Sequence, residues 1–418
     1  MIEEDSRYID AALTDIVGER VRELPKPQRS AIAELAAQLA TYYNLQFRRQ
    51  SADLKSLYRH FNPSVPGGRS AMAAADRAEM KQQFFSLIGD LLGSANYREL
   101  SIEDVQKAMD EQALFDLRVS VNLDDYDRLL VYRRGASRQT MKMKRWLGRF
   151  GEREVEFINY DRVALVFTEN TPGSDIHLKL FQNVPRHDIE ILLPEPRVRM
   201  RLRDKLIIGV PAVVGGGIVL LTKLGPTLLL IASLVGFWLG FQDRSVTIDQ
   251  GVLLALGVGL FALGGHFWRQ FGALKNRRLA FLKVLTENLY FKSLDNNSGA
   301  IQQLLDTAAD EEVKEVFLVY SFLAAENQPV TAAQVDHKIE QWLQQQFACT
   351  TNFDVADAAD KAVALGIAQF SGGQYTSVSF DEALARVNAG LQQLVFPQLS
   401  AQGFTPQGEG MADEMAGG

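Results

Sequence analysis

Apolar residues recur at three- and four-residue spacing through the first part of the chain, a pattern that predicts helices. The periodic stretches are 8–24, 30–61 and 70–92, and Pro25 and Pro27 separate the first two. Ser101 with Asp104 three residues later is typical of a helix N-cap, so a fourth helix is expected to begin there. Residues 1–115 are therefore predicted to form a helical domain.

The hydrophobic period changes after residue 116. Val, Ile, Leu, Phe and Tyr become frequent and partly alternate in 117–132, 154–168 and 175–181, which predicts strands. A short helix is expected between Pro185 and Pro194. Residues 116–203 are predicted to form a small β-rich domain that ends at a membrane.

Three apolar segments follow, at 206–222, 227–241 and 251–268, and none contains Asp, Glu, Lys or Arg. A membrane-crossing helix needs about 20 predominantly apolar residues. The pattern predicts a transmembrane helix block over 204–270. The alternative interpretation of the same pattern is a buried helical core in a soluble protein.

Basic residues flank this block on both sides, which places both flanks in the cytoplasm under the positive-inside rule. Two crossings satisfy that orientation if the segment 227–241 does not span, whereas three crossings remain the alternative. The flanking residues are Arg197, Arg199, Arg201, Arg203 and Lys205 before the block, and Arg269, Lys275, Arg277, Arg278 and Lys283 after it.

The five basic residues before the block are also candidate contacts for anionic lipid. Arg197, Arg199, Arg201 and Arg203 alternate with apolar residues, so a strand would carry all four guanidinium groups on one face. Each basic residue near an anionic surface contributes about 1 kcal/mol. A topology signal without lipid specificity is the alternative interpretation.

Small residues repeat inside the apolar segments at spacings that let helix backbones approach closely. We predict helix packing through these positions, within one chain or between chains. The residues are Ala212, Gly216, Gly236, Gly240, Gly257 and Gly264.

The remainder of the chain is predicted to be helical over 271–325 and disordered over 400–418. Between them, 326–399 shows the order helix, helix, hairpin, helix, which resembles a winged-helix domain. Residues 329–396 contain three basic and seven acidic residues, and a net charge of −4 is the wrong sign for binding nucleic acid. The sequence therefore favours a protein partner for this domain.

No catalytic, cofactor or metal motif is evident. The single cysteine, Cys349, excludes an internal disulfide and a cysteine-based zinc site. His187, Asp188 and Glu190 match no known ligand spacing, so they indicate only a weak candidate for acid–base or metal chemistry. We predict no cofactor and favour a protein that is not an enzyme.

Four sequence blocks resemble an uncharacterised membrane family that includes transmembrane protein 143, a mitochondrial protein in animals with relatives in bacteria and plants. The resemblance covers roughly 95–325 and implies a membrane location with no known activity. The blocks are NLDDYDRLLVYRRG (122–135), LFQNVPRHDIEILLP (180–194), RLRDKLIIGVPAVVGG (201–216) and NLYFKSLDNNSG (288–299).

These observations together predict an α+β membrane protein that acts as a non-enzymatic, membrane-anchored scaffold or assembly protein, oligomeric with copies of itself and with cytoplasmic domains. One alternative is an oligomeric pore or transporter. A second is a lipid-acting enzyme that uses the β-rich domain at the bilayer surface. The acidic N-terminus lacks a transit-peptide pattern, which favours the bacterial inner membrane over the mitochondrial inner membrane.

Overall fold

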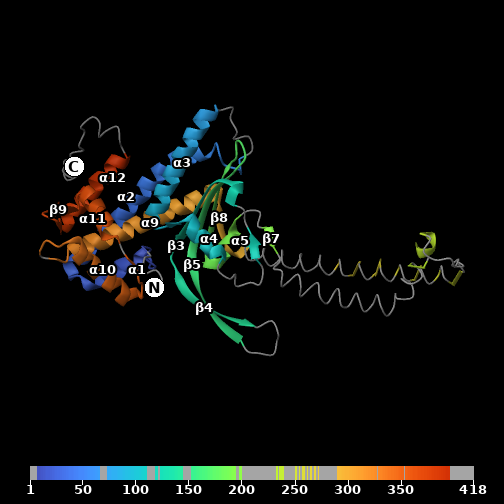
Figure 1. The fold of residues 1–418 in the computed structure, drawn as a ribbon. Coiled ribbons are helices and arrows are strands. Elements are labelled where there is room, and N and C mark those ends of the chain that lie inside the picture. The colour runs from blue at the N-terminus through green and yellow to red at the C-terminus, as the bar shows by residue number, and fades with distance from the viewer. Residues whose placement is uncertain are drawn as a thin grey trace, which may run out of the picture. The chain divides into compact units, whose positions relative to one another are not determined.

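The structure is a computed structural model, and it describes most of the chain outside the apolar block (Figure 1). The described residues are 7–65, 73–110, 118–120, 123–144, 152–193, 197–199, 290–326, 328–352 and 354–395, with separate residues between 232 and 272. They fall into two compact units. One comprises 1–105, 123–186 and 293–418, and the other comprises 106–122 and 187–292.

The N-terminal segment of the first unit consists of three helices. They are α1 (Leu13–Glu23), α2 (Lys26–Tyr58) and α3 (Ala74–Ser94). Pro25 precedes α2 and Pro27 lies in its first turn, where a missing backbone N–H costs no hydrogen bond. α4 (Ile102–Asp110) follows, and the backbone N–H of Asp104 donates to Ser101 Oγ at 3.0 Å. The predicted cap at Ser101 is thus confirmed.

One long hairpin forms the centre of the sheet. β3 (Tyr126–Arg134) and β4 (Ser137–Lys144) both pair with β5 (Glu152–Glu169), so residues 126–144 act as one interrupted strand. The pairs Arg134–Arg162 and Ser137–Asn159 keep the same register across the interruption. Gly135 lies at the interruption with φ +67°, a backbone conformation that glycine adopts most readily.

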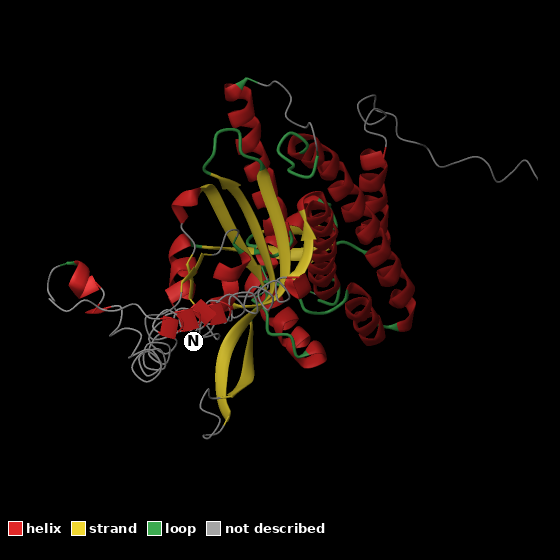
Figure 2. Ribbon diagram, turned by 90° about the vertical axis from the view of Figure 1, so that its right-hand side faces the viewer, coloured by secondary structure: helices red, strands yellow, loops and turns green. Residues whose placement is uncertain are grey.

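Three further strands complete this sheet, whose order is β1-β3-β5-β6-β8 with β4 beside β5. They are β1 (Arg98–Leu100), β6 (Ile176–Pro185) and β8 (Ser293–Asn296), and every pairing in the sheet is antiparallel. β8 comes from a part of the chain more than a hundred residues after β6, so this edge joins distant segments. The strands are drawn in yellow in Figure 2.

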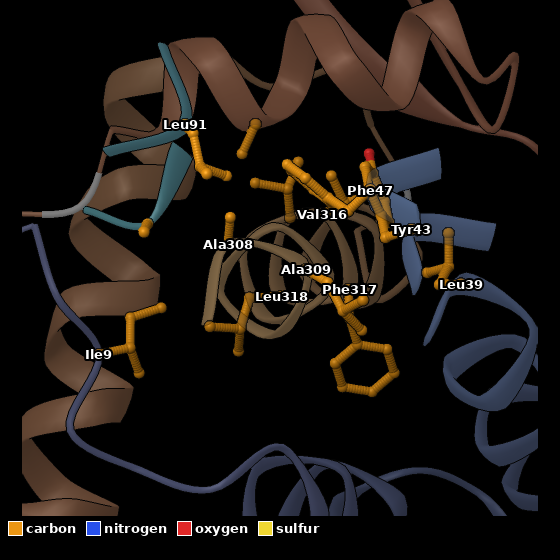
Figure 3. Packing of buried hydrophobic residues seen from close by; sticks show 14 of the residues in the cluster. Ile9, Leu39, Tyr43, Phe47, Leu91, Ala308, Ala309, Val316, Phe317 and Leu318 are labelled. Atoms are coloured by element: carbon orange, nitrogen blue, oxygen red, sulfur yellow. The ribbon is translucent and has the colours of Figure 1, made fainter. Parts of the chain in front are cut away.

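α9 (Asn297–Leu323) is the central helix of the first unit, and it is buried on nearly every side over its second half. Its apolar residues pack against α2, α3 and one face of the sheet, as the cluster around Val316 and Phe317 illustrates (Figure 3). Ile9, from the segment before α1, packs on the same helix. The last turns of α9, Val316–Leu323, are almost entirely apolar, and such a segment requires burial on every side.

The C-terminal module, residues 330–395, contains α10 (Ala332–Phe347), α11 (Val355–Ala364), β9 (Ala368–Ser371), β10 (Gln374–Ser377) and α12 (Phe380–Val395). Gly372 and Gly373 make the turn between the two strands, both at positive φ. Val330 bridges Tyr375, which adds a third backbone segment beside β10. The order helix, helix, hairpin, helix is the basis of the predicted winged-helix resemblance.

The second unit is described over fewer residues. β2 (Arg118–Ser120) pairs antiparallel with β7 (Arg197–Arg199), and α5 (Ile189–Leu192) is a single short helix. The sequence pattern had predicted one strand over 117–132. The structure instead contains β2, a 3₁₀ helix at Leu123–Asp125 and then β3.

The predicted membrane architecture must be corrected. Within the described part of the chain, no helix is both long enough and apolar enough to span a bilayer. The described helices of sufficient length, α2, α3 and α9, all carry charged side chains, which a bilayer core disfavours. Segment 206–222 lies outside the described residues, and 227–241 and 251–268 are described only at separate positions. The α+β membrane protein with a transmembrane helix block is thus replaced by a mixed helical and sheet protein.

Candidate functional site

A group of charged side chains lies inside the first unit, at the middle of α9. We define the α9 charge cluster as Glu311, Glu312, Lys314 and Glu315, all of them buried. Charged residues are almost never fully buried unless they are paired. Their position makes the cluster the most unusual chemical feature of the described residues.

Asn96 and Lys314 donate hydrogen bonds to the carboxylates of Glu311 and Glu315. Asn96, in the turn after α3, donates through Nδ2 to Glu311 Oε2 at 3.1 Å and to Glu315 Oε1 at 2.7 Å. Lys314 Nζ donates to Glu311 Oε1 at 2.9 Å and to the carbonyl of Ile9 at 3.4 Å. Asn96 has φ +59°, a conformation that asparagine tolerates better than most residues.

α11 supplies the cation for Glu312. Lys361 Nζ lies 2.6 Å from Glu312 Oε2, 2.5 Å from Asp357 Oδ2 and 3.9 Å from Glu315 Oε2. Burial alone would lower the pKa of Lys361, but the Glu312 and Asp357 carboxylates outweigh burial and raise it. Lys361 therefore stays charged and joins α11 to α9.

The charge balance of the cluster depends on Glu315. Three buried glutamates face two lysines, Lys314 and Lys361, which also pair with Asp310 and Asp357, so carboxylates outnumber cations if every group is ionised. Burial raises the pKa of Glu315 to about 8. A protonated Glu315 reduces this surplus of negative charge at neutral pH, since a neutral carboxyl needs no counter-ion.

The α9 charge cluster can hold a proton on Glu315, yet its contacts serve mainly to stabilise the fold. They connect the segment before α1, the turn after α3, and α11 to α9. Among the described residues, no group of three His, Cys, Asp or Glu side chains is arranged to hold a metal ion. Sequence reasoning missed the cluster, because Asp-Glu-Glu-Val-Lys-Glu (310–315) looks like the solvated face of a helix.

A second feature lies on the surface of the C-terminal module. Asp336 and Glu340 are one helical turn apart on α10, and Asp354 precedes α11. We call these three residues the acidic patch. Burial, then the charges of Glu340 and Asp354, raises the pKa of Asp336 to about 6. Arg7 pairs with Asp354 at 3.0 Å, so the patch already attracts one guanidinium group.

The basic side chains of this module are all engaged. Lys338 pairs with Glu326, Lys361 pairs with Glu312, and Arg386 pairs with Glu382 and also donates to the Gly366 carbonyl. No lysine or arginine of α10, α11 or α12 is therefore left uncommitted. Each of these cations already has a carboxylate beside it, which weakens its attraction for a phosphate group.

The candidate acid–base residues of the β-rich region are buried. His187 and Asp188 lie in the 3₁₀ helix Arg186–Asp188, and Lys292 Nζ donates to Asp188 Oδ2 at 3.1 Å. Glu190 lies in α5, and its side chain is outside the described residues. The ion pair between Asp188 and Lys292 thus links two segments that lie far apart in the sequence.

The predicted lipid contacts are only partly described. Arg197 and Arg199 lie in β7, where they pair with Ser120 and Arg118 of β2. Arg201, Arg203 and Lys205 lie outside the described residues. The structure therefore leaves this prediction untested.

The predicted helix-packing positions are similarly divided. Ala212, Gly216 and Gly240 lie outside the described residues, whereas Gly236, Gly257 and Gly264 are described as helical. A Cβ atom added at any of these three glycines would meet nothing within 4 Å. Close packing at the six positions stays a prediction.

Part of the chain matches a known protein family. Residues 126–299 match a family model described as "Protein of unknown function (DUF3754)". The match begins at β3 and ends in the first turn of α9, so it includes the long hairpin, β6, β8 and the whole apolar block. A domain of this uncharacterised family is therefore present. No solved structure matches the chain.

Proposed function

We propose that this protein is a non-enzymatic scaffold or assembly protein, and that its C-terminal module binds a basic segment of a partner protein. The observation that carries the proposal is the charge arrangement of this module. Its cations are committed to internal pairs, whereas the acidic patch keeps an excess of carboxylates.

The acidic patch gives the partner its chemistry. Asp336 carries a carboxylate oxygen, Oδ1, that is buried and has no hydrogen-bond partner. Burial, followed by the like charges at Glu340 and Asp354, raises the pKa of this carboxyl. A lysine or arginine of a partner would reduce the repulsion between these carboxylates. Arg7 already does so at Asp354.

The same electrostatics disfavour nucleic acid. Phosphate binding needs uncommitted lysines or arginines, because neutralised phosphates supply most of the binding free energy. The net charge of −4 over 329–396 would also repel a polyanion.

The other predicted functions have less support. The pore or transporter depended on the transmembrane block, which has been corrected. A lipid-acting enzyme would need His187 and Asp188 near a surface, yet both are buried and Asp188 is tied to Lys292. We keep homo-oligomerisation and a cytoplasmic position of the soluble domains as parts of the proposal, which also includes kinship with the family of transmembrane protein 143.

The test is a binding comparison on the full chain. The probes are a labelled helical peptide of lysine, leucine and alanine, a counterpart with glutamate in place of lysine, and a short DNA duplex. We expect the basic peptide alone to bind, with an affinity that falls as salt rises. The double variant Asp336→Asn, Glu340→Gln should weaken binding several-fold.

Asp381→Asn is the matched control, since it removes a carboxylate from the start of α12 outside the acidic patch. Equal binding by the wild type and the double variant would refute the proposal, as would tighter binding of DNA than of the basic peptide. Light scattering on the same samples reports the oligomeric state.

A further inference from the structure

Among the described residues, β3 has an open edge over part of its length. It pairs with β5 from Tyr126 to Arg134, whereas β1 covers only Val131, Tyr132 and Arg133 on the other side. Within the described part of the chain, no strand pairs with residues 127–130 on that side. Alternate backbone N–H and C=O groups of a strand point to each side, so this edge presents hydrogen-bonding groups outward.

A groove runs along this open edge. It encloses about 310 Å³, and residues 126–131 of β3 form one wall. Leu100 of β1, Ile102 and Val105 of α4, and Leu123 of the 3₁₀ helix complete the lining with apolar side chains. Ile102 is 58% exposed, an unusual degree for an isoleucine at the mouth of a cavity.

The charged residues that line the groove already have partners. Asp127 pairs with Lys81 at 2.6 Å, and the Arg128 guanidinium lies 4.3 Å from the centre of the Phe85 ring. Glu99 accepts a hydrogen bond from the hydroxyl of Tyr132 at 3.3 Å. The groove therefore offers an occupant backbone hydrogen bonds and apolar contacts, beside charged side chains that already contact a neighbouring group.

We propose that this groove binds an extended, uncharged segment of a partner protein, which adds to β3 as a strand in line with β1. A free strand edge supplies affinity through main-chain hydrogen bonds, and adjacent pockets select alternate side chains. Four residues of a strand span about 13 Å, so a short segment fills the open edge. The surface is separate from the acidic patch, so this inference does not rest on the proposed function.

Short peptides test the proposal on the full chain. The probes are labelled, acetylated and amidated five-residue peptides in which serine and threonine alternate with Val, Ile, Leu or Phe. Each has a counterpart whose central amide nitrogen is methylated, which removes one backbone donor and keeps the side chains. We expect binding, and a loss of about tenfold or more on methylation, equivalent to ~1.4 kcal/mol.

Ile102→Asp is the diagnostic variant. The side chain is exposed and lies at the first position of α4, where an acidic residue is favourable, so the fold should persist. This variant should weaken peptide binding about tenfold, because it removes one apolar side chain from the groove. A tenfold loss is equivalent to about 1.4 kcal/mol of binding free energy. Phe370→Asp, on the exposed side of β9, is the matched control and should leave binding unchanged.

Three results would overturn the proposal. Equal binding of the methylated peptides would show an apolar pocket that does not use the strand edge. Absence of binding by any peptide at millimolar concentration would show that the edge accepts no strand. Concentration-dependent self-association that Ile102→Asp abolishes and the peptides inhibit would show that a second copy of the chain is the occupant.

Discussion

Lys361 of α11 and Glu312 of α9 form an ion pair across the interior of the first unit, with 2.6 Å between Nζ and Oε2. Glu312 is buried, whereas the lysine side chain keeps 29% of its exposure. The pair joins the C-terminal module to the central helix. It therefore adds to the apolar contacts that hold a candidate binding module to the remainder of its unit.

Lys361→Met should destabilise the fold by about 3 kcal/mol, because it leaves a buried glutamate without its counter-ion. Chemical denaturation of the full chain measures this change. Lys338→Met is the control, since its partner Glu326 is more exposed and such pairs contribute about 1 kcal/mol or less. Equal effects of the two variants would contradict the structural role assigned to Lys361.

Glu315→Gln should flatten the dependence of stability on pH. Burial raises the pKa of Glu315 from 4.5 to about 8, so folding favours the protonated carboxyl. The stabilisation is fully present below pH 4.5 and is lost as pH rises towards 8. Glutamine keeps an oxygen for Asn96 and cannot ionise, so the variant should gain stability relative to the wild type between these pH values.

The comparison for Glu315→Gln is Asp306→Asn, an exposed acid on the same helix. Thermal melts of both variants and the wild type from acidic to mildly alkaline pH provide the measurement. A wild-type curve that shows no decline over this range, or a Glu315→Gln curve that parallels it, would contradict the prediction.

Gly135→Ala should cost more stability than Gly173→Ala. Both glycines have positive φ, which costs an alanine about 1–2 kcal/mol. At Gly135 a Cβ would also lie 2.0 Å from Asp161 Oδ2, whereas at Gly173 it would meet nothing within 4 Å. Adding Asp161→Ala to Gly135→Ala should remove most of this extra cost, and a double-mutant cycle measures that coupling.

Asp188→Asn should lower stability by about 1–3 kcal/mol, because it weakens a buried, charge-assisted hydrogen bond from Lys292. Lys292→Met should have an effect of the same sign, and the two should be non-additive. Additive effects would show that the pair contributes nothing in solution.

Some features of this protein were readable from sequence because they depend on neighbours along the chain. The helices of the first hundred residues follow from apolar spacing, and the Ser101 cap follows from two side chains three residues apart. β5 and β6 are apolar enough to be recognised as strands. β4 was missed, since Ser-Arg-Gln-Thr-Met-Lys-Met-Lys lacks the apolar, β-branched composition that marks a strand.

Other features were decided by contacts between distant segments. The chain by itself determined local helix and strand preference, the absence of a disulfide and the negative charge of the C-terminal module. Only the tertiary structure decided that the charged middle of α9 is buried, because its partners Ile9, Asn96 and Lys361 lie far away in the chain. The open edge of β3 is likewise a matter of tertiary pairing, because β1 is the strand beside it in the described part of the chain and covers three of its residues. Pairing and burial depend on which surfaces meet, and spacing along one chain does not specify that.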